Sequence, residues 1–160
     1  MAGKLPGNHK LKHTNNMKTE KQEWEVICTY TTAEAVEDGT LILVDEKICK
    51  EAGIKFPVYL TQAVFTKYVQ VPEVLKGMQD ESGRLWDLLY MFTVKAFKTS
   101  SANMDFQFVC MLPNAGNWEK HEKIIFEMPQ HRTVTLKAVI QGRDFDDPSP
   151  AIFIMKPNED

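Results

Sequence analysis

The sequence predicts an α+β fold, in which short N-terminal helices and one long buried helix pack on a C-terminal antiparallel β-meander. Between residues 81 and 99, apolar side chains follow the 3.6-residue period of a helix and leave a single polar stripe. After residue 100 the period changes to two, and four runs rich in β-branched and aromatic residues are separated by short turn-forming segments. Strands joined by short connections pair as antiparallel neighbours.

Three short helices are expected before the long one. Threonine and aspartate side chains accept hydrogen bonds from the first turn of a helix, and a glycine just beyond the last turn ends it. These residues recur at helix-length spacings in the N-terminal half. We expect helices over residues 33–38, 46–52 and 62–69, with Thr31 or Thr32, Asp45 and Thr61 as caps and with Gly39 and Gly53 after the first two.

Two apolar runs lie between these short helices. Residues 41–44 fit either a buried strand or the underside of a loop. Residues 56–60 include Pro57, which lacks the N–H group that a central strand needs, so a central strand is disfavoured there.

The long helix is expected to form the centre of the core. Asp80 or Ser82 can cap it, and apolar side chains occupy most of its circumference, so it must be covered on several sides. The four strands that follow are expected over residues 105–112, 123–128, 133–141 and 151–156.

Length and charge indicate one domain with a basic extension. The chain has 160 residues, and its 43% hydrophobic content is typical of a folded protein. Residues 1–22 hold five lysines and one glutamate, a net charge of +4, which leaves −7 on the other 138 residues because the total is −3. We expect a flexible leader over residues 1–22 and a single domain over residues 23–160. The acidic balance argues against a nucleic-acid-binding domain, and such contact is expected only through the leader.

The cysteines and the longest apolar stretch indicate a cytoplasmic protein without membrane contact. Cys28, Cys49 and Cys110 are widely spaced in apolar surroundings, which is typical of buried reduced thiols. No cysteine or histidine pair has metal-ligand spacing, so neither a metal nor a cofactor is expected. The apolar stretch 85–97 contains two charged residues and is too short for a bilayer core of about 30 Å.

The densest group of chemically active side chains lies at the start of the long helix. Free backbone N–H groups and the helix dipole favour anions there. Arg84 could bind an anionic group, Trp86 could stack on it, and a nearby carboxylate could act as a base. Gly83 inside the first turn costs about 1 kcal/mol relative to alanine, which suggests close approach by another group. The candidate binding residues are Asp38, Asp80, Glu81, Arg84, Trp86 and Asp87, and no catalytic residue is assigned.

A purely structural interpretation of the same residues is also open. Asp80 or Ser82 would cap the helix, Arg84 would pair with Asp87, and Trp86 would fill the core. Asp38 joins the candidates because an acidic helix end conflicts with the dipole, so a contact with an arginine such as Arg84 or Arg132 is expected.

Five segments together resemble a family of small uncharacterised bacterial proteins that are also carried by plasmids and phages. The segments are AEAVEDGTLILVD, EAGIKFPVYLTQAVF, QDESGRLWDLLYM, VTLKAVIQGRD and IFIMKPNED, within residues 26–160. The family pattern matches Glu37, Asp38, Gly39, Gly53, Phe56, Pro57, Val58, Asp80, Glu81, Gly83, Arg84, Trp86 and Asp87. The resemblance implies a compact cytosolic protein of unknown activity, and it does not extend to the leader or to the long loop over residues 114–122.

Two functional hypotheses follow. The first is a non-enzymatic accessory protein of a mobile element, which binds a protein partner through its acidic surface. The alternative is a small enzyme or a protein that binds a small anionic ligand in a pocket around Asp80, Arg84, Trp86 and Asp87. The second hypothesis requires those side chains to converge on one concave site.

Overall fold

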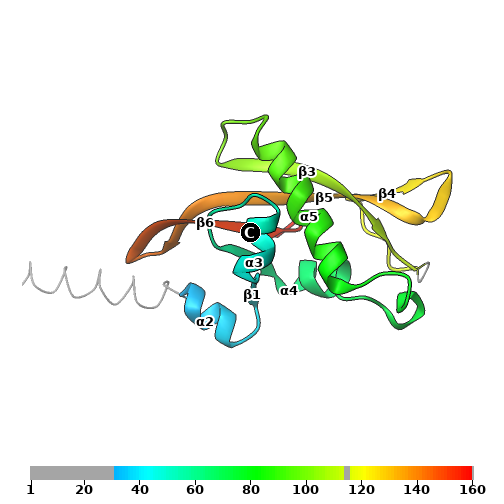
Figure 1. Ribbon diagram of the computed structural model, residues 1–160, viewed down its shortest axis with the longest axis horizontal. Helices are drawn as coiled ribbons and strands as arrows, with labels where there is room; N and C mark the ends of the chain where they lie inside the picture. Colours follow the sequence, from blue (N-terminus) through cyan, green and yellow to red (C-terminus); the bar gives the residue numbers. More distant parts are fainter. Residues whose placement is uncertain (1–30, 114–115, 160) are drawn as a thin grey trace, which may run out of the picture.

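A computed structural model describes residues 31–113 and 116–159, and it has the predicted α+β class (Figure 1). Its elements in chain order are α2 (Thr32–Glu37), β1 (Leu41–Leu43), α3 (Glu46–Glu51), β2 (Val58–Thr61), α4 (Gln62–Val64), the π-helical turn η1 (Phe65–Val69), the 3₁₀ turn η2 (Glu73–Leu75), α5 (Glu81–Ala96), β3 (Asn103–Met111), β4 (Glu122–Ile125), β5 (Met128–Asp144) and β6 (Asp147–Met155). The expected leader over residues 1–22, the start of the expected domain at residue 23, and Cys28 lie outside the described residues.

The predicted caps begin the short helices. The Thr31 hydroxyl accepts from the Glu34 backbone N–H at 3.1 Å, and the Glu34 carboxylate accepts from the Thr31 N–H at 2.9 Å. This reciprocal pair is a capping box. The Asp45 carboxylate likewise accepts from the Lys47 N–H at 2.7 Å at the start of α3. After α3, Gly53 has a φ of 87°, a left-handed conformation that side chains with a Cβ avoid. Local hydrogen bonding therefore places both helices where the sequence predicts them.

The sheet has six strands in the order β1-β2-β6-β5-β3, and β4 also pairs with β5. Strand β5 has β3 along one edge, while β4 and β6 follow one another along its other edge. The β4–β5 and β5–β6 hairpins project from opposite ends of the molecule (Figure 1). Strands β2 and β6 are parallel, and the other pairs are antiparallel.

The expected simple meander is therefore wrong in its strand order. Strands β3 and β4 are consecutive in sequence, but both pair with β5 and not with each other. The connection over residues 112–121 is longer than the two to five residues of a typical hairpin loop, so the chain can cross to the far edge of β5. Strand β2 is also interior, between β1 and β6, although Pro57 disfavours a central strand. Pro57 just precedes β2, and its carbonyl accepts from the Ile152 N–H at 2.9 Å, so no ladder donor is lost within β2.

The long helix is buried on one side and not on several. Leu88, Leu89 and Phe92 face the sheet and are at most 2% exposed. On the outer side, Trp86 and Tyr90 are 37% and 45% exposed and stack on each other with their ring centroids 4.9 Å apart. A single sheet covers only one face of a helix, and the remaining aromatic rings partly cover each other. Helix α5 ends at Ala96, before the predicted residue 99.

Both sheet faces carry helices. The main core lies between the sheet and α3, α4, η1 and α5, and it includes Cys49 and Cys110. The opposite face holds a smaller cluster of Tyr59, Ala151, Phe153 and Met155, against which Val36 of α2 packs. Cys49 and Cys110 are free and buried, as predicted, and burial raises the pKa of each thiol to about 11. Within residues 31–113 and 116–159, no helix is long and apolar enough to cross a membrane.

Candidate functional site

The predicted site at the start of α5 is brought together in part. Asp80, Arg84 and Asp87 line a cavity of about 490 Å³, together with residues 77–79 and Gly83. Burial raises the pKa of Asp87.

The other predicted residues lie elsewhere. Glu81 is exposed and Trp86 stacks on Tyr90, and neither lines this cavity. Asp38 lies at the end of α2, where its carboxylate accepts from the Thr40 N–H at 2.9 Å. Within residues 31–113 and 116–159 it forms no ion pair with an arginine, contrary to the prediction. The guanidinium of Arg132 instead lies 3.4 Å above the ring of Trp118.

Arg84 connects helix α5 to two other segments of the chain through hydrogen bonds. It is 4% exposed, and its Nε donates to Gln79 Oε1 at 3.0 Å. Its Nη1 donates to the Gln70 carbonyl at 2.6 Å, and its Nη2 donates to the Met111 carbonyl. Helix α5 is thereby joined to the connection before it and to the end of β3. Among the described residues, Arg84 and Asp87 form no ion pair, contrary to the structural interpretation of the sequence.

Helix capping accounts for Gly83. The Gly83 N–H donates to Asp80 Oδ1 at 2.6 Å, and a Cβ at position 83 would lie 2.8 Å from that oxygen. The close approach that Gly83 suggests is therefore made by the capping carboxylate of Asp80. Asp80 is the cap, one of the two residues that the sequence predicts for that position.

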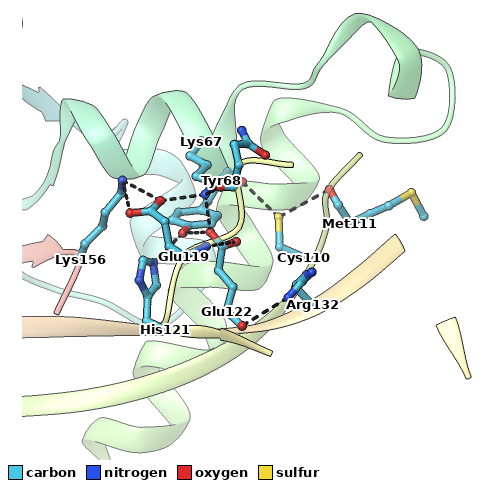
Figure 2. Close-up of polar contacts among 10 residues, drawn as sticks. Lys67, Tyr68, Cys110, Met111, Glu119, His121, Glu122, Arg132 and Lys156 are labelled. Carbon is cyan, nitrogen blue, oxygen red and sulfur yellow. Dashed lines mark hydrogen bonds and ion pairs between the residues drawn. The ribbon is translucent and has the colours of Figure 1, made fainter. Parts of the chain in front are cut away.

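A second group of polar side chains, which the sequence did not predict, lies between η1 and β4 (Figure 2). We call it the polar cluster. It consists of Lys67, Tyr68, Glu119, His121, Glu122 and Lys156, which come from the π turn, from the loop before β4, from β4 itself and from the residue after β6.

Local structure explains how Glu122 and Tyr68 become buried. Glu122 is opposite Val134 in the β4–β5 ladder, and Val134 faces the core, so the pleat turns the Glu122 side chain inward as well. The π turn closes with a bond from the Gln70 N–H to the Phe65 carbonyl at 2.9 Å, five residues apart, and Tyr68 within it is fully buried. Short π segments are frequent at functional sites.

Tyr68 joins the imidazole and a carboxylate of the cluster. Its hydroxyl donates to Glu122 Oε2 and lies 2.6 Å from His121 Nε2. Because the hydroxyl proton is given to Glu122, Nε2 must carry a proton and donate to Tyr68. The pKa of Tyr68 is strongly raised, by burial and then by the bond to Glu122, so the phenol stays protonated.

The two lysines neutralise the two glutamates. Lys67 Nζ lies 2.7 Å from Glu119 Oε2 and 2.7 Å from Glu122 Oε2, and Lys156 Nζ lies 3.1 and 3.0 Å from the two oxygens of Glu119. The Glu122 side chain is 0% exposed, and those of Lys67, Lys156 and Glu119 are 15%, 16% and 31% exposed. Burial by itself would raise the pKa of Glu119, but the lysine hydrogen bonds outweigh it and lower that pKa. Charges removed from water in this way require such pairing.

Because the pKa of His121 is lowered in the folded protein, we expect a loss of stability below neutral pH. Its pKa lies below 6.5 because burial disfavours the imidazolium more strongly than Glu119 and Glu122 favour it. In the unfolded chain the imidazole takes up its proton at higher pH than in the folded chain, so protonation favours unfolding. The contribution of the neutral imidazole to the free energy of unfolding is fully present above pH 6.5. It decreases as the pH falls from there towards the pKa of His121 in the folded protein. Urea unfolding between about pH 7.5 and about pH 5 should show this decrease, and His121→Gln should reduce it. An unchanged pH dependence in the variant would contradict this assignment.

The cluster also contains atoms that could coordinate a metal ion. One ligand atom each from Glu119, His121 and Glu122 lies within 4.8 Å of the others. However, the Lys67 ammonium already contacts both carboxylates, and His121 Nε2 is bound to Tyr68. A divalent cation would have to displace Lys67 from both glutamates. The arrangement therefore favours binding of an anion at the lysines over binding of a cation at the glutamates.

A cavity of about 570 Å³ adjoins the two lysines. Its polar lining is Lys67, Lys156, Asn117, Gln62 and Thr66, and its apolar lining is Ala63, Pro72, Leu112 and Pro113. Two lysine side chains that line the same cavity can bind an anionic group there.

Comparison with known proteins identifies a family but no activity. The model of the family of unknown function DUF6573 matches residues 17–160. No curated protein and no solved structure matches the chain significantly. The match supports the predicted uncharacterised family, while the bacterial, plasmid and phage association stays a prediction. Since the match covers most of the chain, the protein belongs to the family of unknown function DUF6573.

Proposed function

We propose that this protein is a binding protein that holds an anionic group of its ligand between Lys67 and Lys156. The observation that carries the proposal is the convergence of both ammonium groups on the single carboxylate of Glu119, beside the 570 Å³ cavity that Lys67 and Lys156 line. The proposal retains the predicted binding role and moves the site from residues 80–87 to this cavity. A role as a mobile-element accessory factor that acts on a protein partner is compatible with it and stays a prediction.

The cavity at the start of α5 is less suited to an anion. The three guanidinium nitrogens of Arg84 already donate to protein oxygens. The carboxylates of Asp80 and Asp87 line the same cavity and would repel a negative ligand.

Lys156→Met tests the proposal. Its ammonium contacts only Glu119 among the described charged groups, whereas Lys67 also neutralises the buried Glu122. In the wild type, sodium acetate and sodium phosphate at constant ionic strength should shift the amide resonances of Lys67, Asn117 and Lys156 saturably. Because Lys156→Met loses one charge-assisted contact, its affinity for whichever of the two anions binds more tightly should fall about tenfold.

Lys50→Met is the matched control. Lys50 forms an exposed ion pair with Glu46, with side chains 70% and 81% exposed, and does not line the cavity. The Lys50→Met substitution removes the same charge as Lys156→Met and should leave anion binding unchanged. Absence of saturable shifts in the wild type, or equal binding by wild type and Lys156→Met, would refute the proposal.

A further inference from the structure

We infer that the ligand binds through a carboxylate, which takes the place of the Glu119 carboxylate between Lys156 and Lys67. This inference rests on the proposed anion-binding function of the cavity. Glu119 then acts as an internal competitor that occupies the lysines until the ligand arrives.

The contacts of Glu119 describe the bound group. Lys156 Nζ contacts both of its oxygens, at 3.1 and 3.0 Å, and Lys67 Nζ contacts Oε2 at 2.7 Å (Figure 2). The two ammonium groups are thus already spaced to hold one planar carboxylate. A ligand carboxylate in the same position would make the same bonds without rearrangement of either lysine.

Charge balance favours a singly charged group. With Glu119 in place, the four charged side chains of the cluster sum to zero. When the Glu119 carboxylate leaves, Glu122 is the only carboxylate of the cluster that balances Lys67 and Lys156, and the net charge is +1. A monocarboxylate restores neutrality, whereas doubly charged phosphate leaves an excess negative charge beside the fully buried Glu122.

Glu119 is also the charged residue that can leave at least cost. Its side chain is the most exposed of the four. The Glu122 N–H donates to the Glu119 carbonyl at 3.0 Å, and the Glu119 N–H donates to Glu122 Oε1 at 3.3 Å. These backbone bonds persist if only the side chain rotates, so the loop need not unfold.

The remaining lining describes the rest of the ligand. Ala63, Pro72, Leu112 and Pro113 offer apolar contacts, and Gln62 and Thr66 offer hydrogen bonds. The ligand class is therefore a carboxylate with a short, largely apolar body. A free carboxylic acid and the C-terminus of a partner peptide share this chemistry.

Glu119→Gln in the full chain tests the inference, with sodium butyrate, an acetylated tripeptide ending in valine, and sodium phosphate as probes. The glutamine is nearly isosteric but no longer neutralises the lysines. If Glu119 occupies the lysines for most of the time, the variant should bind butyrate or the peptide about tenfold more tightly than the wild type does, as measured by amide shifts. Tighter binding of butyrate indicates a free carboxylic acid as the ligand, and tighter binding of the tripeptide indicates the C-terminus of a peptide. Glu119→Ala serves as a second variant, and Glu46→Gln, which removes an exposed paired carboxylate, is the control.

The outcomes separate this inference from the proposed function. Tighter carboxylate binding by both Glu119 variants, with a smaller gain for phosphate, supports it. If the wild type binds an anion through Lys156 but the Glu119 variants bind carboxylates no more tightly, or prefer phosphate, the inference is wrong and the proposed function stands. If the wild type binds none of the probes, the proposed function is refuted whatever the Glu119 variants do, and the inference that rests on it is wrong as well.

Discussion

Arg84→Met is expected to lower the free energy of unfolding by about 3 kcal/mol, because removal of a buried donor that forms three hydrogen bonds leaves its partners unsatisfied. The substitution keeps much of the buried apolar stem but abolishes the bonds to Gln79, to the Gln70 carbonyl and to the Met111 carbonyl. For a protein of this size, the loss corresponds to a melting temperature about 10 °C lower. Thermal and urea unfolding of the variant measure the effect.

Lys95→Met is the control for Arg84. Lys95 is exposed in the last turn of the same helix, so its substitution removes the same charge without removing a buried donor. Its effect should remain within about 0.5 kcal/mol. Equal stability of Arg84→Met and the wild type would contradict this structural role and favour the ligand-binding interpretation of the sequence.

Glu122→Gln is expected to destabilise the protein by a similar amount, about 3 kcal/mol. The carboxylate is 0% exposed, accepts from the Tyr68 hydroxyl and contacts the Lys67 ammonium at 2.7 Å. The neutral amide would leave part of the Lys67 charge uncompensated in a poorly solvated position. Glu127→Gln, at an exposed position in the β4–β5 turn, provides the matched control.

A double-mutant cycle isolates the ion pair from other effects of Glu122→Gln. In Lys67→Met the Glu122 charge loses its cation, whereas the double variant has neither charge. The double variant should therefore lose less stability than the sum of the single variants, by about 1 kcal/mol or more. Strict additivity would show that Glu122 acts through packing and not through charge.

Much of the local structure could be predicted from the sequence because its signals are contiguous. The capping threonine and aspartate residues and Gly53 act within one or two turns, and they placed α2, α3 and the start of α5. Alternating residues likewise predicted β3 to within two residues at each end. The partial convergence of Asp80, Arg84 and Asp87 follows from their spacing on one helix.

The polar cluster was beyond such reasoning. Its members are distributed from residue 67 to residue 156, and no pair of them has the spacing of a known motif. The nearest signal was the grouping of Glu119, His121 and Glu122 before a predicted strand, which by itself resembles an ordinary polar loop.

The sequence alone determined the α+β class, the capped helices α2 and α3 and membership of an uncharacterised family, because periodicity, caps and ordered segments are properties of neighbouring residues. The predicted helix over residues 62–69 is instead the short α4 followed by the π turn η1. The tertiary structure decided that β2 is interior, that α5 is covered on one side, that Arg84 binds backbone carbonyls, and that two lysines meet one glutamate beside a cavity. These features depend on which distant strands pair and on what each side chain then meets. Local propensity carries no information about either, so the candidate site emerges only once the chain is folded.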